Sequence, residues 1–219
     1  MNGNPDALNQ HKSKWESLAQ EDDRYYVRSV EHEQSDEEYD TSGQEHVSRF
    51  IQDDPVVSRR LAPFQEKVVL EIGCGSGRLT KSLARLFKHV VAVDVAPTML
   101  AKARKFVDSA NVTFVESDGV SVPIVPETVD FAFSYIVYQH FPSAQSVGLS
   151  FGNVHRALRS GGLFKVQIRG LKHADSNHWS WGPHYEERDA LALVAKTGFR
   201  VLNSAGAGTR SYWLLLEKL

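Results

Sequence analysis

From about residue 68 onward, apolar and polar positions follow two alternating spacings. Short runs of branched apolar residues predict strands, and between them apolar positions recur every three or four residues, which predicts helices. The expected strands are Val68–Ile72, Val90–Val95, Val112–Val115, Val129–Val137, Leu163–Ile168, Phe199–Asn203 and Tyr212–Glu217. Because strands that alternate with helices form parallel sheets covered on both faces, we predict a doubly wound α/β fold with a mostly parallel seven-stranded sheet.

The expected helices lie between these strands. They are a helix whose apolar face holds Leu79, Leu83, Leu86 and Phe87, a helix from Pro97 to Phe106, one whose face holds Val147, Phe151, Val154 and Leu158, and one from Glu186 to Lys196. Gly161 and Gly162 suit a helix C-terminus. No helix separates the last two strands, so we expect an antiparallel hairpin at one edge of the sheet.

The N-terminal segment has a different character. Residues 1–45 are polar and acidic, with aromatic residues at Trp15, Tyr25 and Tyr26. Such a segment is either a disordered tail or a lid that orders over a site. Val47, Phe50 and Ile51 then follow helical spacing, and this helix is expected to end before Pro55. We therefore predict an extension over residues 1–45 and one domain over residues 46–219.

Composition narrows the class of protein. A hydrophobic content of 42% supports one sizeable core. The 25 Lys and Arg nearly balance the 27 Asp and Glu, and no basic cluster stands out, which argues against a nucleic-acid partner. The single cysteine excludes an internal disulfide, and no run approaches the ~18 apolar residues of a membrane-spanning helix. The first residues also lack the apolar core of a signal peptide, so we expect a cytoplasmic protein.

A glycine-rich turn follows the first expected strand. Gly73, Gly75 and Gly77 stand where that strand must turn into a helix, and glycine lets backbone approach a ligand closely. Dinucleotide-binding turns space their glycines as G-x-G-x-x-G, which would require glycine at position 78, where this chain has Arg78. No G-K-[ST] follows, so the turn is not a P-loop.

An acidic residue ends the second expected strand. The carboxylate of Asp94 can accept hydrogen bonds from both hydroxyls of a ribose, a feature shared with nicotinamide enzymes. The G-x-G-x-G turn preceded by Glu71 resembles motif I of the class I, Rossmann-like S-adenosylmethionine-dependent methyltransferases, in particular those acting on small molecules. Residues Val95–Leu100 resemble the segment after the second strand of that family, and Leu158–Leu163 resemble the turn before its fifth strand.

The resemblance implies a site for S-adenosylmethionine, with S-adenosylhomocysteine as product. In that family the residue matching Asp118 accepts the adenine amino group, the amide matching Gly119 meets a ring nitrogen, Met99 packs near the adenine, and backbone near Ser134 meets the methionine amino group. The expected cofactor-binding residues are Glu71, Gly73, Cys74, Gly75, Gly77, Asp94, Val95, Met99, Asp118, Gly119 and Ser134. Cys74 lies inside the turn, where a small side chain is needed, so we expect a structural role for it.

The acceptor side of the site is marked less clearly. His140 follows the fourth strand, and a neutral imidazole there is a candidate general base, with a structural role as the alternative. The candidate substrate-binding residues are Tyr25, Tyr26, Tyr138, Arg169, Trp179 and Trp181. The two tryptophans suit packing against the sheet equally well. The histidines and aspartate at positions 173, 175, 178 and 184 match no zinc spacing, so no metal site is predicted.

Together these signals predict an enzyme that transfers a methyl group from S-adenosylmethionine to a hydroxyl, amine or carbon of a small-molecule acceptor. Ser134–Val137 lacks the Asn/Asp-Pro-Pro-Tyr/Phe run of enzymes that methylate the exocyclic amines of bases. The alternative is a non-catalytic module that binds S-adenosylmethionine or a nucleoside. We expect a small-molecule acceptor as partner, and neither a membrane nor a nucleic acid.

Overall fold

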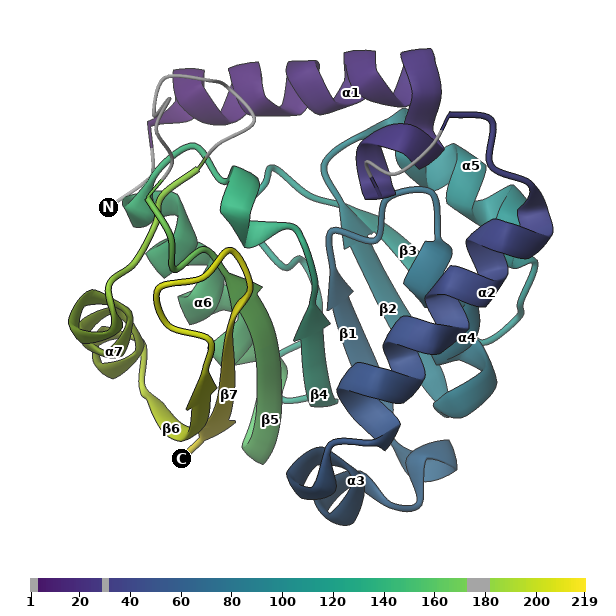
Figure 1. Cartoon of the computed structure of the whole chain (residues 1–219). Helices are drawn as coiled ribbons and strands as arrows, with labels where there is room; N and C mark the ends of the chain where they lie inside the picture. Colours follow the sequence, from purple (N-terminus) through teal and green to yellow (C-terminus); the bar gives the residue numbers. More distant parts are fainter. Residues whose placement is uncertain (1–3, 29–31, 173–181) are drawn as a thin grey trace. The chain divides into compact units, whose positions relative to one another are not determined.

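The computed structural model describes residues 4–28, 32–172 and 182–219 (Figure 1). Its strands follow the order β3-β2-β1-β4-β5-β7-β6. The pairs β1–β2, β2–β3 and β4–β5 are parallel, and β7 pairs antiparallel with β5 and β6, which confirms the predicted α/β fold with an antiparallel C-terminal hairpin. The chain divides into two compact units, residues 12–117 and residues 1–11 with 118–219, and each is described by itself.

The unit of residues 12–117 is built on three parallel strands. These are β1 (Val68–Ile72), β2 (His89–Asp94) and β3 (Val112–Glu116). The helix α4 (Arg78–Leu86) connects β1 to β2, and α5 (Pro97–Val107) connects β2 to β3. β2 lies between the other two, with Val91 opposite Leu70 of β1 and Thr113 of β3. Four of the five β1 residues are buried, as the unbroken apolar run predicts for a strand covered on both faces.

The unit of residues 118–219 holds the other four strands. They are β4 (Val129–Ser134), β5 (Leu158–Ile168), β6 (Phe199–Ala205) and β7 (Tyr212–Lys218), with the 3₁₀ turn η3 (Tyr138–His140) and the helices α6 (Ala144–Ala157) and α7 (Glu187–Lys196). β4 ends at Ser134, three residues before the predicted end at Val137. The strand cannot continue because Ile136 takes a left-handed conformation with φ 56°.

The prediction that Gly161 and Gly162 end a helix is wrong. α6 already ends at Ala157, and both glycines lie within β5, where its pairing with β4 shifts register. A Cβ atom at Gly162 would lie 2.8 Å from the carbonyl oxygen of Arg159 and 3.3 Å from that of Asp130. Gly162 is therefore required by close backbone approach at this irregularity in the ladder.

The acidic N-terminal segment is helical where it is described. It contains α1 (Pro5–Arg28), α2 (Asp36–Val47), the π-helical turn η1 (Ser48–Gln52), α3 (Pro55–Leu61) and the 3₁₀ turn η2 (Phe64–Glu66). The predicted helix end before Pro55 is confirmed, since η1 ends at Gln52. The helix begins much earlier than predicted, because Ser35 and Glu38 form a capping box in front of α2.

α1 bends at Asp22, whose φ of −157° and ψ of 88° are not helical. The Asp22 carboxylate accepts a hydrogen bond from the backbone N–H of Tyr25 at 3.0 Å and so caps the second part of the helix. The break frees the carbonyl of Ala19, which accepts from Nζ of Lys102 on α5 at 2.8 Å. Lys102 also pairs with Asp23 at 2.5 Å, so α5 holds both sides of the bend.

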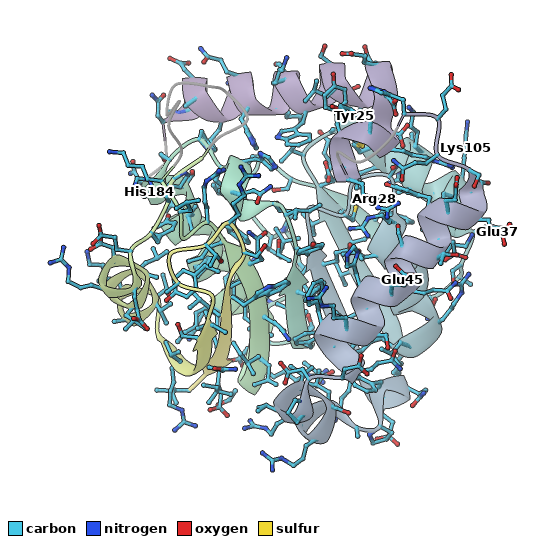
Figure 2. All side chains as sticks on the ribbon, viewed as in Figure 1. Tyr25, Arg28, Glu37, Glu45, Lys105 and His184 are labelled. Atoms are coloured by element: carbon cyan, nitrogen blue, oxygen red, sulfur yellow. The ribbon has the colours of Figure 1, made fainter. Side chains whose placement is uncertain are left out.

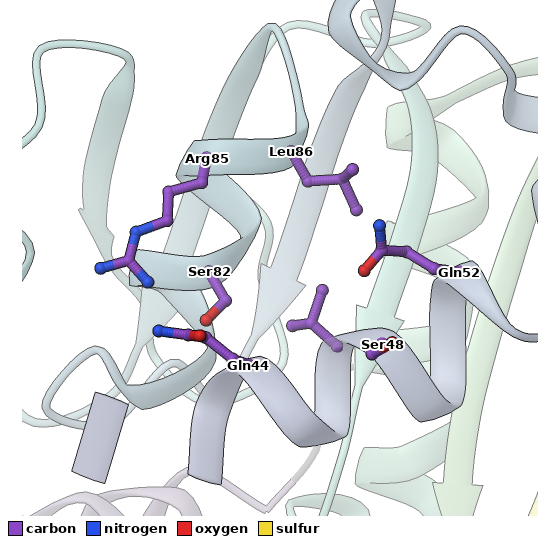
Figure 3. Close-up of a pocket in the computed structure, with 7 residues that line it drawn as sticks. Gln44, Ser48, Gln52, Ser82, Arg85 and Leu86 are labelled. Carbon is purple, nitrogen blue, oxygen red and sulfur yellow. The ribbon is translucent and has the colours of Figure 1, made fainter. Parts of the chain in front are cut away.

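α2 packs closely against α4 (Figure 1). A Cβ atom at Gly43 would lie only 2.1 Å from the carbonyl oxygen of Arg78, so the two helices meet at a point where no side chain fits. A hollow of about 380 Å³ lies beside this contact (Figure 3), lined by Gln44, Val47, Ser48, Gln52, Ser82, Arg85 and Leu86. Glu37 and Glu45 are exposed acidic residues of α2 (Figure 2).

Replacement of a helical glycine by alanine should have opposite effects on stability at Gly43 and at Gly152. Gly43→Ala should lower the free energy of unfolding by about 1–3 kcal/mol, because the new methyl group meets backbone that cannot move aside. Gly152→Ala on α6 has open space around it and should raise the free energy of unfolding by about 0.5–1 kcal/mol through helix propensity. Urea unfolding measures both, and a Gly43→Ala variant as stable as the wild type would contradict the close contact.

Candidate functional site

The turn from β1 into α4 has a backbone conformation that favours glycine. Gly75 and Gly77 have φ values of 54° and 94°, in the left-handed region that side chains disfavour. The N–H groups of Gly73 and Cys74 donate to the carbonyl of Val93 at 2.8 and 3.0 Å, which fixes the start of the turn to β2. A Cβ atom at Gly77 would lie 2.7 Å from the side chain of Val107. Gly77 therefore packs closely against α5, and the approach of this turn to a ligand stays a prediction.

The carboxylate of Asp94 lies directly against this turn. Its Oδ2 accepts a hydrogen bond from the N–H of Gly75 at 2.8 Å, and its Oδ1 accepts from the N–H of Ala96 at 3.0 Å. Burial raises the pKa of Asp94, although both hydrogen bonds oppose the shift. A carboxylate offers about four acceptor positions, so Asp94 keeps the capacity to accept a further hydrogen bond from a ligand hydroxyl.

Glu71, the acidic residue before the turn, is almost fully buried. It is 2% exposed, and the hydroxyl of Thr80 donates to its Oε2 at 2.6 Å. Burial raises the pKa of Glu71 to about 7, while the Thr80 hydrogen bond and the charge of Arg78 act in the opposite direction. Cys74 is also buried, and burial raises the pKa of its thiol, which suits the predicted structural role.

α1 covers the surface around the turn, and it belongs to the segment for which the sequence left a disordered tail and a lid as alternatives. A Cβ atom at Gly75 would lie 2.6 Å from Cγ2 of Val27, in the second part of α1. Met99 is 1% exposed and packs with Ala19 and Ala96, against which Trp15 and Val27 also pack. Met99 is therefore part of a buried apolar cluster, and its place beside an adenine ring stays a prediction.

A second anchor joins α1 to α5. The carboxylate of Glu16 accepts hydrogen bonds from both the backbone N–H and the hydroxyl of Thr98, at 3.0 and 2.5 Å. Thr98 lies next to Met99 in the segment that follows Val95. The first turn of α5 is therefore capped by a residue from α1, and no local sequence signal points to Glu16.

In the other unit, Asp118 and Gly119 begin a tight loop after β3. The Asp118 Oδ1 accepts from the N–H groups of Val120 and Ser121 at 3.0 and 2.7 Å, and its Oδ2 accepts from the Ser121 hydroxyl at 2.8 Å. Burial raises the pKa of Asp118, but these hydrogen bonds outweigh it and the pKa lies below its usual value. Asp118 thus stabilises its own loop here, and its role toward an adenine stays a prediction.

The turn after β4 carries the acceptor-side candidates. Ser134 is 1% exposed at the end of β4. Tyr138 is also 1% exposed, and its hydroxyl lies 2.8 Å from that of Ser150, so it contributes to the core. The half-buried His140 places its Nε2 3.0 Å from Nε2 of Gln139.

His11 is a neighbour of this turn that the sequence did not indicate. Its ring centroid lies 6.2 Å from that of Phe141, and it forms a hydrogen bond with the backbone of His140. Burial lowers the pKa of His11 to about 4, with the His140 hydrogen bond opposing, so this imidazole is neutral at pH 7. Two imidazole side chains therefore flank the turn.

The remaining substrate candidates occupy separate places. Tyr25 stacks on His32 with centroids 4.0 Å apart and meets Tyr26 edge-on, and the Tyr26 hydroxyl donates to Glu21 at 2.9 Å. Arg169 is 2% exposed, and its Nε donates to the carbonyl of Leu171 at 2.9 Å. Trp179 and Trp181 lie outside the described residues. A role in acceptor binding stays a prediction for all of them.

The described part of the chain has neither a metal-binding cluster nor a membrane-spanning helix. Within residues 4–28, 32–172 and 182–219, no group of three or more His, Cys, Asp or Glu side chains is arranged to hold a metal ion. Over the same residues, no helix combines the length and apolar character needed to cross a membrane.

The raised pKa of Glu71 predicts a pH-dependent stability. Because the pKa is near 4.3 in the unfolded chain and about 7 in the folded protein, stability from this group is complete below pH 4 and is lost as pH rises through 7. Glu71→Gln keeps an acceptor for Thr80 and removes the titration. Urea unfolding measures the free energy of unfolding of both proteins. Between pH 4.5 and pH 8, the value for the wild type should fall by about 3 kcal/mol relative to that for the variant. A constant difference would contradict the buried protonated acid.

Comparison with known proteins agrees with this geometry. A family model described as a methyltransferase domain matches residues 69–162, which include the glycine turn, Asp94, Asp118 and Ser134. An uncharacterized methyltransferase of Synechocystis is 30% identical over 158 residues, covering 69% of this chain and 71% of that protein. A malonyl-[acyl-carrier protein] O-methyltransferase of Bacillus cereus is 30% identical over 123 residues, and the match spans 55% of this chain but only 44% of that protein.

A solved structure has a fold similar to that of this chain. Phosphoethanolamine N-methyltransferase 1 of Haemonchus contortus, in complex with phosphoethanolamine and S-adenosylhomocysteine, superposes with a TM-score of 0.71 at 16% identity, covering 97% of this chain and 49% of that one. At this identity the likeness shows the fold alone. The sequence match with the Synechocystis protein and the family model carry the assignment, and the chain belongs to the S-adenosylmethionine-dependent methyltransferases.

Proposed function

We propose that this protein transfers the methyl group of S-adenosylmethionine to a hydroxyl, amine or carbon of a small-molecule acceptor. The observation that carries the proposal is the hydrogen bond between the Gly75 amide and the Asp94 carboxylate. This bond sets an acceptor for ribose hydroxyls beside a glycine-rich turn. The arrangement fits a nucleoside with a short polar chain and needs no diphosphate-binding helix start.

Relatives of this chain support a small acceptor. The Bacillus cereus relative is named for O-methylation of malonyl-[acyl-carrier protein], and the Haemonchus contortus neighbour holds phosphoethanolamine. The malonyl group and phosphoethanolamine each carry an anionic group. Arg169 at the end of β5 is our candidate partner for such a group, since a guanidinium binds carboxylate and phosphate in a fixed geometry.

The cofactor supplies an activated methyl group on a sulfonium with a good leaving group. The protein therefore has to align the reactants and exclude water, which accounts for the absence of a nucleophile among the predicted site residues. Asp94 and the glycine turn orient the donor. A hydroxyl or amine acceptor must also lose a proton, and His140 is our candidate to accept it.

We infer that α1 is the lid of this site. Trp15 and Val27 pack beside Met99 and against Gly75, and Glu16 and Lys102 fasten the helix to α5. The bend at Asp22 separates a part fixed by Glu16 from the part that carries Val27 onto the turn. Movement of the second part gives access to the turn, and its return excludes water from a bound cofactor.

Binding of the reaction product tests the cofactor site. The wild type should bind S-adenosylhomocysteine and not NAD in calorimetric titrations. Asp94→Ala should weaken binding of S-adenosylhomocysteine by about 1–3 kcal/mol, because it removes charge-assisted hydrogen bonds to the ribose. Asp130→Ala removes a carboxylate that pairs with Arg159 and serves as the control. Equal affinity of the Asp94→Ala variant and the wild type would remove Asp94 from the site.

Hydrogen exchange tests the lid. Saturating S-adenosylhomocysteine should slow exchange of the amides of residues 15–28 about tenfold, because a closed helix over the ligand opens less often. The amides of α7, which has no part in the lid, should be unaffected. Unchanged exchange along α1 would show that the helix does not respond to the cofactor.

A further inference from the structure

The glycine turn contains one side chain whose partner lies outside the turn. Ser76 stands between Gly75 and Gly77 and is 3% exposed. Its hydroxyl oxygen lies 2.8 Å from that of Tyr39, on α2. The only hydroxyl of the turn therefore pairs with a residue that precedes it by 37 positions and lies before the family match, which begins at residue 69.

Tyr39 is held so firmly that its hydroxyl has a fixed position. The residue is fully buried, and its ring meets that of Phe106 edge-on with centroids 5.3 Å apart. On another side, the guanidinium of Arg24 lies over the ring at 5.0 Å from the centroid. Burial raises the pKa of Tyr39, so the hydroxyl stays neutral and protonated at any physiological pH. A buried neutral hydroxyl needs a hydrogen-bond partner, and Ser76 supplies it.

α2 also contacts Arg78, the residue that follows the turn. Nη1 of Arg78 donates to the carbonyl of Ser42 at 3.3 Å and lies 2.7 Å from Nδ1 of His46. One position after Ser42, the backbone of Gly43 contacts the carbonyl of Arg78. The turn thus has α2 contacts at Ser76 within it and at Arg78 directly behind it.

We propose that Tyr39 is a positioning residue for the cofactor turn, which acts through Ser76 to keep residues 75–77 in the conformation that receives the methionine portion of the cofactor. The proposal rests on the proposed function. Gly73, Gly75 and Gly77 of the turn have left-handed conformations, and glycine has more freedom to rearrange than any other residue. A fixed hydrogen bond at Ser76, between two of these glycines, therefore restricts the conformation of the turn. Asp94 grips the same turn from β2 at Gly75, on the side where the ribose is expected.

The test separates the two parts of the ligand. Tyr39→Phe keeps the ring and removes only the hydroxyl, so its packing on Phe106 remains. We expect the Kd for S-adenosylhomocysteine to rise about fivefold and the Kd for adenosine to change less than twofold, because only the first ligand reaches into the turn. Ser76→Ala should give the same rise, and the double variant should be no weaker than either single variant, since both remove one interaction.

Tyr212→Phe is the matched control. Tyr212 is likewise fully buried, and its hydroxyl lies 2.9 Å from that of Ser204, but it belongs to β7 in the other unit. The Tyr212→Phe variant should lose about as much thermal stability as Tyr39→Phe, but keep the wild-type affinity for S-adenosylhomocysteine. An unchanged Kd in Tyr39→Phe, an equal loss for both ligands, or additive effects in the double variant would overturn the proposal. A wild type that binds no S-adenosylhomocysteine would instead overturn the proposed function.

Discussion

One hydrogen bond, from the Gly75 amide to the carboxylate of Asp94, organises this site. β1 and β2 are parallel neighbours, so their carboxyl ends meet at the same edge, and the turn after β1 comes to lie beside the last residue of β2. Burying the Asp94 carboxylate costs free energy, which the amides of Gly75 and Ala96 offset. The same contact fixes the shape of the turn and, by the proposed function, also places the carboxylate that would accept hydrogen bonds from the cofactor ribose.

The central part of the fold follows from local sequence. The strands β1, β2 and β3 are short apolar runs bounded by polar turns, and a glycine turn between a strand and a helix leaves few alternatives. Asp94 was predictable because the end of β2 is marked by the change from apolar to acidic residues. These features need no knowledge of distant contacts, and the structure places them as the pattern indicates.

The parts that sequence could not predict depend on contacts between distant segments. α2 has few apolar positions because it approaches α4 through Gly43. In the sequence alone, a glycine suggests the end of a helix, because its contact with the Arg78 carbonyl is not visible there. Its capping box at Ser35 and Glu38 was the one local signal for its start. Gly162 was misread for the same reason, since its neighbours on β4 and β5 appear only in the folded sheet. The cover of the turn by Val27 likewise has no signature in the sequence.

A methyltransferase and a protein that only binds S-adenosylmethionine would share every contact described for Asp94, so the transfer itself decides between them. The most direct measurement is incubation with S-adenosylmethionine carrying a tritiated methyl group and a fractionated metabolite extract. Label should pass into a low-molecular-mass compound, and Asp94→Ala should slow its appearance when the cofactor is limiting. Saturable binding of S-adenosylmethionine with no label leaving it, or label found only in nucleic acid, would contradict a small-molecule methyltransferase.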